Sequence, residues 1–307
     1  MVRKPTGKAK VFMSAKSDIV FKMLFGNERN KDLLIQFLMA VLNLPLHEYS
    51  DIQISDPQSK RKYEGDKLAI LDVKVKTTSG KVINIEIQVH VSREMRERIV
   101  FYNAKMMTEQ LGSGDDYNLI KKTINIVITG EKFIREHDEY HDKFTIFSSQ
   151  TNTEFTDIVE IHTLELSKLP TETDGTDLWS WLEFINANSE EALTVLAQKS
   201  PKMKMPVEKL LELNQDAYAR EVYEARIKQQ RDNRALQRRF RDEALEEGRR
   251  EGRREGQKKG RQEGRQEGIH DVAKKLIEMH LPVEDIVNAT GLTAKEIESL
   301  KSKSTSS

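Results

Sequence analysis

Hydrophobic and polar positions change their period several times along this chain. Residues 32–44, DLLIQFLMAVLNL, place apolar side chains at helical spacing and stop before Pro45, which predicts a buried helix. The segments after it alternate apolar with polar or charged residues, which is the period of a strand. These predicted strands are residues 51–57, 68–77 and 82–91.

A second group of elements continues the pattern. Residues 92–111 are expected to form a helix, and TINIVIT at 123–129 is the short apolar run of a strand that is buried on both faces. Beyond Thr176 the pattern is helical. Strands followed by helices predict an α/β (α+β) fold with a mixed sheet, flanking helices and a helical C-terminal extension. Two further strands are expected, at residues 143–149 and 157–165.

The second and third predicted strands form a hairpin. A three-residue turn at 78–80, ending in a glycine that accepts the left-handed conformation, pairs Thr77 with Lys81. This register sets Asp72 opposite Glu86, with Cβ atoms about 5 Å apart. Two carboxylates this close repel each other unless a cation lies between them. A magnesium ion is a hard cation that one or two carboxylates hold together with waters and phosphate oxygens.

The same alternation gives a simpler interpretation of these residues. Asn84, Glu86, Gln88 and His90 share one face of the third strand, and the isoleucines between them share the other. The polar face of an ordinary hairpin is solvated and needs no ligand. The two interpretations differ in whether Asp72 and Glu86 act as a pair.

The hairpin belongs to a larger set of motifs. Together they resemble the PD-(D/E)XK nuclease superfamily and, more narrowly, the Rpn family of recombination-promoting nucleases and transposase-like proteins of bacteria. A glycine-repeat tail followed by a GLT-containing helical hairpin adds to the likeness. The motifs are DIVFKMLFG at 18–26, LDVKVKT at 71–77, NIEIQV at 84–89, RIVFYNAKMMTEQL at 98–111 and INIVITG at 124–130.

The resemblance implies a restriction-endonuclease-like fold and a metal-dependent nuclease. Asp72 and Glu86 would be metal ligands, with the backbone carbonyl of Ile87 as a third. Asp18 would add another carboxylate from a helix. Gln88 stands where the superfamily has a lysine, so it can hydrogen-bond a water but carries no charge.

Two basic residues near the hairpin complete the implied site. Lys74, two residues beyond Asp72 on the same face, is the expected substitute for the missing lysine. Arg98, at the start of the following helix, is expected to reach a DNA phosphate. Tyr102, one helical turn later, is expected to pack against the sheet.

Charge is distributed unevenly along the chain. The 307 residues carry 50 Lys and Arg against 50 Asp and Glu, which excludes a uniformly basic nucleic-acid coat. Basic residues nevertheless dominate an N-terminal arm at 1–16 and the segment from Arg226 to Arg241, where Asp232 is the only acid. Such segments hold DNA through its phosphates. The expected contacts in the second segment are Arg231, Arg234, Arg238 and Arg239.

Cysteine content and hydropathy restrict the expected location of the protein in the cell. The absence of cysteine excludes disulfides and thiolate metal sites. No apolar stretch is long enough to span a bilayer, and no signal-peptide core follows the basic N-terminus. We therefore expect a cytoplasmic protein without membrane contact, associated with the bacterial nucleoid.

Six glycines recur at every fourth position from Gly248 to Gly268, with charged residues and glutamines between them. Six glycines inside one helix cost about 6 kcal/mol relative to alanine, and charge pairs worth a few tenths each do not offset this. The segment is therefore either a flexible charged linker or a helix that a partner chain holds. The second interpretation predicts a homodimer through the C-terminal helices.

The expected organisation has five parts: a basic arm (1–16), a nuclease-like domain (17–170), a helical extension (171–245), the glycine repeat (246–268) and a helix-turn-helix-like module (269–301). The expected function is a magnesium-dependent DNA endonuclease of low sequence specificity, acting in recombination, transposition or DNA defence. One alternative is a DNA-binding accessory protein that keeps the nuclease scaffold and cuts weakly. Another is a pure assembly protein, which leaves Asp72 and Glu86 unexplained.

Overall fold

The computed structural model describes residues 11–55 and 72–304. The chain divides into two compact units, Met1–Lys228 and Gln229–Ser307. Each unit is a separate body with its own core. The predicted N-terminal arm lies largely outside the described residues, and so do the first part of the second predicted strand and the end of the first.

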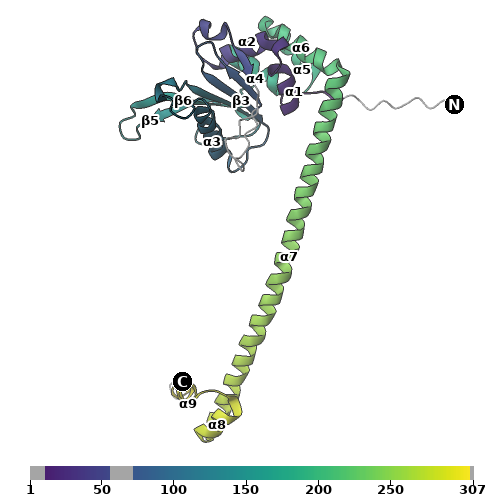
Figure 1. Ribbon diagram of the computed structural model, residues 1–307. Coiled ribbons are helices and arrows are strands. Elements are labelled where there is room, and N and C mark those ends of the chain that lie inside the picture. Colours follow the sequence, from purple (N-terminus) through teal and green to yellow (C-terminus); the bar gives the residue numbers. More distant parts are fainter. Residues whose placement is uncertain (1–10, 56–71, 305–307) are drawn as a thin grey trace, which may run out of the picture. The chain divides into compact units, whose positions relative to one another are not determined.

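A mixed sheet forms the centre of the first unit (Figure 1). Among the described residues it has six strands in the order β1-β2-β3-β4-β6-β5. Strands β3, β4 and β6 are parallel neighbours, whereas β1, β2 and β5 pair in antiparallel fashion. The bounds are β1 Gln53–Ser55, β2 Val73–Lys76, β3 Val82–Gln88, β4 Thr123–Thr129, β5 His141–Phe147 and β6 Glu154–Glu165.

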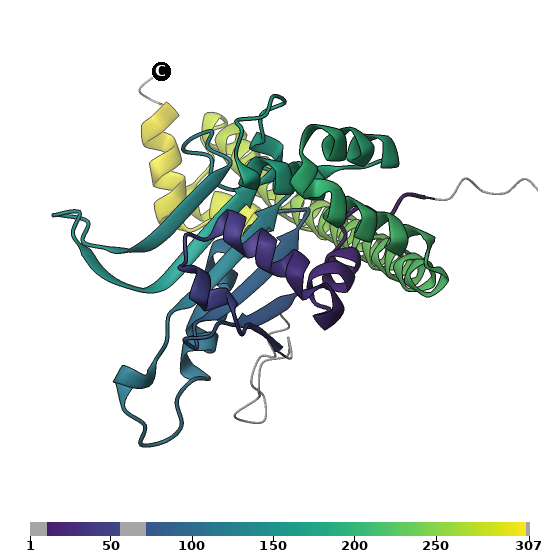
Figure 2. The same ribbon diagram turned by 90° about the horizontal axis from the view of Figure 1, so that it is seen from above.

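Helices α1, α2 and α4 cover one face of the sheet. Figure 2 shows α1 and α2 lying across it. Their apolar sides meet Ile83, Ile85 and Ile87 of β3 and the matching isoleucines of β4 in one buried cluster. Parallel strands need a long crossover, and the helix α3 provides it between β3 and β4. The helices of this unit are α1 Asp18–Phe25, α2 Lys31–Val41, α3 Met95–Thr108, α4 Asp177–Asn186, α5 Glu190–Lys199 and α6 Lys204–Gln215.

Helix α3 covers the opposite face of the sheet. Its residues Met95 and Ile99 pack on Val127 of β4, and Met106 packs on Val82 of β3. Between these two apolar contacts, the surface beneath α3 consists largely of polar side chains. The polar positions of β3 therefore lie under a helix.

The start of the described chain is tied to the far end of the same unit. The backbone N–H of Met13 donates to Oδ1 of Asn214 at 2.8 Å, and Nδ2 of Asn214 donates back to the carbonyl of Met13 at 3.0 Å. The hydroxyl of Ser14 donates to the carbonyl of Ala187 at 2.6 Å. These hydrogen bonds thus join the N-terminal segment of the first unit to α6 and to the end of α4, far away in sequence.

The predicted fold class is confirmed, since the sheet is mixed and its helices flank it in a manner consistent with a restriction-endonuclease-like fold. The buried strand at 123–129 is matched residue for residue. The predicted helix at 92–111 is shorter, Met95–Thr108, and β3 ends at Gln88, so that Val89 is 43% exposed and does not face the core. Strands β5 and β6 begin two or three residues earlier than predicted.

The second unit contains most of the helix α7, Ala217–Glu278, and the helices α8, Val283–Thr290, and α9, Ala294–Ser304. Helix α7 runs unbroken through all six repeated glycines, as the helix alternative describes, and the partner chain that would hold it stays a prediction. A Cβ atom added at any of these glycines meets nothing within 4 Å. Nothing in the described part of the chain therefore uses the space that the glycines leave.

The end of α7 packs with α8 and α9 into a small module. Ala273, Ile286 and Ile297 form its buried centre, one residue from each helix. Gly291 ends α8 in the left-handed conformation, with φ of 72°, as the turn of the predicted helical hairpin requires. Within the described ranges, no helix is both long enough and apolar enough to cross a bilayer.

Candidate active site

The β2–β3 hairpin brings Asp72 beside Glu86. Val73 pairs with Ile85 and Lys74 with Asn84, so Asp72, directly before β2, comes opposite Glu86. The backbone N–H of Ile87 donates to Oδ2 of Asp72 at 3.0 Å, which fixes the carboxylate against β3. The predicted register is therefore the observed one.

The turn of this hairpin has its own anchor. Thr77 N–H donates to the carbonyl of Lys81 at 2.9 Å, and Gly80 has a φ of +90°, as the predicted three-residue turn requires. The carboxylate of Glu48 accepts hydrogen bonds from the hydroxyls of Thr77 and Ser79, at 2.7 and 2.8 Å, and an ion pair from Lys81. This buried glutamate holds the turn and thereby the register of Asp72.

Asp72 and Glu86 are both desolvated. Glu86 is 3% exposed, and the Asp72 side chain is 17% exposed. Burial raises the pKa of Glu86 to about 7, against the lowering effect of Arg98 and with a smaller raising effect from Asp72. Burial also raises the pKa of Asp72, while its hydrogen bond from Ile87 and the nearby Lys22 act in the opposite direction. The solvated-face interpretation therefore fails for both carboxylates.

Two cationic side chains approach the carboxylates. Nη2 of Arg98 is 3.7 Å from Oε2 of Glu86, and Nζ of Lys22 is 3.9 Å from Oδ1 of Asp72. Neither contact is a close hydrogen-bonded ion pair. Within the described residues, Nε and Nη2 of Arg98 are buried without a hydrogen-bond partner. The guanidinium also lies over the ring of Tyr102, 5.9 Å from its centroid, and Tyr102 packs against Val82 and Met106, as expected.

The remaining predicted site residues fall in different surroundings. Nζ of Lys74 is 3.0 Å from Oε2 of Glu109, so its charge is already paired. Gln88 ends β3 and is half-buried. Asp18, in the first turn of α1, accepts from the backbone N–H of Ile19 at 2.9 Å through Oδ1.

The other oxygen of Asp18 is also engaged. Oδ2 accepts two hydrogen bonds from the guanidinium of Arg226, one of them from Nε at 2.9 Å. The negative charge of Asp18 nevertheless contributes to the raised pKa of Asp72, so the two carboxylates are neighbours. In this arrangement Asp18 joins the start of α7 to α1 and has no free oxygen.

Asparagines continue the polar surface beneath α3. Nδ2 of Asn84 donates to Oδ1 of Asn125 on β4 at 2.9 Å, and Asn103 of α3 pairs with Thr123. Oδ1 of Asn84, Nδ2 of Asn103 and Nδ2 of Asn125 are buried without a hydrogen-bond partner inside the described ranges. Unpaired buried amides are costly, at about 1–3 kcal/mol each. The face that bears Glu86 is therefore polar along most of its length.

The four arginines expected to contact DNA lie on α7 in the second unit. Arg231, Arg234, Arg238 and Arg239 are on the surface of that helix. Nε of Arg239 is 2.8 Å from Oε1 of Glu243, an exposed pair one turn apart. All four side chains are exposed.

The donor set fits a hard divalent cation. Asp72, directly before β2, and Glu86 of β3 present carboxylate oxygens, the ligands that magnesium prefers. Burial raises the pKa of both groups, and the nearby cations do not outweigh it. In the described part of the chain, three or more carboxylate or histidine groups nowhere gather into a closed metal cage. Waters and phosphate oxygens have to complete the coordination of any ion held here.

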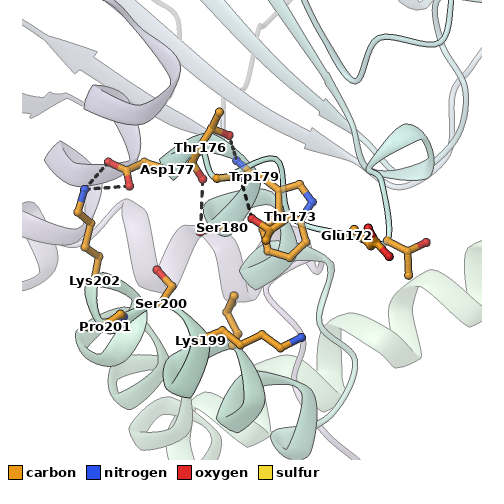
Figure 3. A pocket seen from close by; sticks show the side chains of 13 residues that line it. Glu172, Thr173, Thr176, Asp177, Trp179, Ser180, Lys199, Ser200, Pro201 and Lys202 are labelled. Atoms are coloured by element: carbon orange, nitrogen blue, oxygen red, sulfur yellow. Dashed lines mark hydrogen bonds and ion pairs between the residues drawn. The ribbon is translucent and has the colours of Figure 1, made fainter.

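A cavity of about 610 Å³ lies elsewhere in the first unit, between the start of α4 and the end of α5 (Figure 3). Nζ of Lys202 donates to both carboxylate oxygens of Asp177 at 2.9 and 2.8 Å, and Thr176 caps α4 through Trp179. These polar groups satisfy one another, and neither Asp72 nor Glu86 lines the cavity. It takes no part in the carboxylate site.

Sequence reasoning missed three residues of this region. Lys22 and Arg226 come to the site from α1 and the start of α7, and Glu48 comes to the turn from a short 3₁₀ helix. Lys22 falls within the DIVFKMLFG motif, which was the available signal. Arg226 begins the basic segment at 226–241, which pointed to DNA and not to Asp18, and Glu48 stands in no recognisable pattern.

The hairpin of this mixed sheet thus places the buried Glu86 of β3 beside the partly buried Asp72, which directly precedes β2. The model of the family described as PD-(D/E)XK nuclease family transposase matches residues 15–239, well over half of the chain. The chain therefore belongs to the PD-(D/E)XK nuclease family transposases. Comparisons with curated proteins and with solved structures gave no match.

Proposed function

We propose that this protein is a magnesium-dependent DNA endonuclease of low sequence specificity. The observation that carries the proposal is a pair of carboxylates: Glu86 is buried on β3, and Asp72 is partly buried directly before β2. Both have raised pKa values, and neither has a close cationic partner among the described residues. Two acids with a purely structural role are expected to have cationic partners, because burial of uncompensated charge destabilises the fold. Membership in a nuclease family supports the same function.

In this proposal the chain's own residues bind and orient the reactants. Asp72, Glu86 and the carbonyl of Ile87 hold Mg²⁺, which lowers the pKa of a bound water and stabilises charge on the phosphate. The side chain of Gln88 hydrogen-bonds the attacking water. Arg98, whose buried nitrogens lack partners, binds a phosphate oxygen. Asp18 is retained as an outer carboxylate that reaches the ion only if Arg226 releases it.

DNA is held mainly through its backbone. The basic arm at 1–16 and the α7 arginines 231, 234, 238 and 239 contact phosphates, which fixes the duplex without reading its sequence. Such binding weakens steeply with salt. The setting we propose is recombination, transposition or DNA defence in the bacterial cytoplasm, close to the nucleoid.

A plasmid-nicking assay tests the nuclease activity. Supercoiled DNA is incubated with the full-length protein in Mg²⁺ or in EDTA, beside the Asp72→Asn variant. We expect cleavage only in Mg²⁺, and a loss of at least about 1,000-fold in the variant. DNA binding, measured by fluorescence anisotropy, stays within about threefold because the phosphate contacts remain. Equal cleavage by both proteins places the activity elsewhere.

A second function follows from Gln88. Without the superfamily's lysine, the scaffold also suits a DNA-binding accessory protein that cuts weakly. Salt-sensitive DNA binding with no Mg²⁺-dependent cleavage supports this alternative. If Gln88→Lys then creates cleavage, the missing charge is the reason for the weak activity.

We also propose a homodimer through the C-terminal helices. The six glycines of α7 lower helix stability by about 1 kcal/mol each, and the space beside them is empty. A second copy of α7 packed along the glycines recovers that stability. Light scattering of the full-length protein is expected to give a dimer, and truncation after Ala244 a monomer. A full-length monomer, or a truncated dimer, contradicts the assembly.

A further inference from the structure

Lys22 of α1 lies beside the carboxylate pair, a position that its place in the sequence does not predict. It lies one helical turn after Asp18 on α1, while Phe21 and Phe25 of the same helix are buried in the core. Its Nζ is 3.9 Å from Oδ1 of Asp72, and its side chain is 32% exposed. Since the N–H of Ile87 holds Oδ2, the ammonium stands at the oxygen that the hairpin backbone leaves free.

Two other cations near the site are already engaged. Lys74 is paired with Glu109 at 3.0 Å. Arg226 is bound to Asp18 through two nitrogens. Lys22 differs from both, because a separation of 3.9 Å leaves its ammonium hydrogens available to another acceptor.

The packing of α1 fixes the position of Lys22. Gly26 ends α1 next to the start of β2, where an added Cβ atom would be in ordinary contact with Val73 at 3.7 Å. The same Cβ atom would lie 2.7 Å from the carbonyl oxygen of Lys22, so the clash that favours glycine is internal to the end of α1. At the other end of α1, Asp18 is tied to Arg226. This ion pair and the core packing of α1 hold the helix beside the hairpin, so the distance between Lys22 and Asp72 is set by the fold.

We propose that Lys22 is the catalytic cation that replaces the lysine missing at Gln88, and that its ammonium contacts the attacking water and the scissile phosphate. This inference rests on the proposed nuclease function. In the hydrolysis, the water oxygen forms a bond to phosphorus, and the bond between phosphorus and the leaving sugar oxygen breaks. The water proton passes to solvent, and the leaving oxygen takes a proton from solvent. Lys22 stays protonated and contributes charge and a hydrogen bond.

A purely structural role for Lys22 makes a different prediction. A half-exposed ion pair at this distance contributes less than about 1 kcal/mol to stability. Removal of the charge then changes neither folding nor cleavage appreciably. Cleavage, metal affinity and rescue at a second position therefore separate the two roles.

The experiment compares full-length Lys22→Gln with wild type, using Lys31→Gln as a matched loss of one lysine charge, because Lys31 is almost equally exposed at 31% and lies 4.0 Å from Glu28. For Lys22→Gln we expect a fall in the cleavage rate constant of at least about 100-fold. Binding of Mn²⁺, measured by calorimetry, is expected to be unchanged or tighter, because a positive charge next to Asp72 has been removed. Lys31→Gln is expected to cleave within about fivefold of wild type, since its ion pair lies outside the carboxylate site.

Rescue of cleavage by a second substitution separates the two roles of Lys22 more clearly than the single variant does. The double variant Lys22→Gln/Gln88→Lys is expected to recover at least about tenfold in rate over Lys22→Gln, because the charge returns from the neighbouring strand. Undiminished cleavage by Lys22→Gln overturns the role of Lys22 and leaves the nuclease proposal intact. Lost Mn²⁺ binding, or no rescue, also overturns it and shows that Lys22 only positions Asp72. A wild type that does not cleave defeats the proposed function itself.

Discussion

Two buried glutamates at opposite ends of one hairpin behave in opposite ways. Glu48, at the turn, is 2% exposed, and Glu86, at the open end, is 3% exposed. Burial acts to raise both pKa values, but hydrogen bonds from Lys81, Thr77 and Ser79 outweigh it at Glu48 and lower the pKa to about 2. At Glu86 burial prevails, and the pKa is about 7. Two glutamates that are both nearly inaccessible to solvent thus differ in the hydrogen-bond partners that the fold gives them.

Loss of the charge at the turn is expected to have the largest effect on stability. Glu48→Gln removes the partner of Lys81 and is expected to lower the free energy of unfolding by about 3 kcal/mol at pH 7. Because the folded pKa lies below the ordinary value of 4.5, this contribution is present above pH 4.5 and disappears as the pH falls through about 2. Urea denaturation of both proteins between pH 7 and pH 2.5 measures it. A constant difference across this range contradicts the assignment.

At the open end of the hairpin the opposite sign is expected. Glu86→Gln removes a charge that the fold does not neutralise and is expected to raise the free energy of unfolding by about 2 kcal/mol at pH 8 in EDTA. The favourable protonated state of Glu86 is full below pH 4.5 and lost as the pH rises through about 7, so the gain of the variant vanishes at pH 4.5. Thermal unfolding at the two pH values tests this. The same variant is expected to lose cleavage.

The control for that gain is a buried acid that has a partner. Glu109→Gln unpairs Lys74, so it is expected to lower stability at pH 8. If Glu109→Gln and Glu86→Gln both stabilise the protein, burial alone decides the sign of the change in the free energy of unfolding. The comparison between the two ends of the hairpin then fails.

The smallest effect is expected at an exposed acid. Glu212 of α6 is 68% exposed and pairs with Lys209 at 3.1 Å. Glu212→Gln is expected to change the free energy of unfolding by less than about 0.5 kcal/mol, because water screens the pair. Urea denaturation at pH 7 is the measurement. A larger loss shows that contact distance, and not burial, governs these ion pairs.

The sequence predicts the hairpin well because its information is local. Turn geometry at Gly80 and the strict alternation of β3 are enough to place Asp72 beside Glu86. What lies over a strand is not local. Asn84 and Glu86 have the pattern of a solvated face, yet α3 covers them, and that helix is too polar for its period to reveal a buried side.

The cationic part of the site could not be predicted for the same reason. Lys74 is near Asp72 in sequence and shares its face, but α3 brings Glu109 to pair with it. Lys22 is 50 residues away from Asp72 and reaches it only because tertiary packing brings α1 beside the hairpin. Periodicity assigns residues to faces, whereas tertiary packing decides which charges meet.

The ties between the two ends of the first unit affect how the protein is made. Met13 bonds to Asn214, and Asp18 bonds to Arg226. A ribosome that adds about 5–20 residues per second needs roughly 10–40 seconds to progress from the first member of each pair to the second. During that time α1, and Lys22 with it, lacks its final anchors. A growing chain therefore carries Asp72 and Glu86 well before α1 receives these anchors.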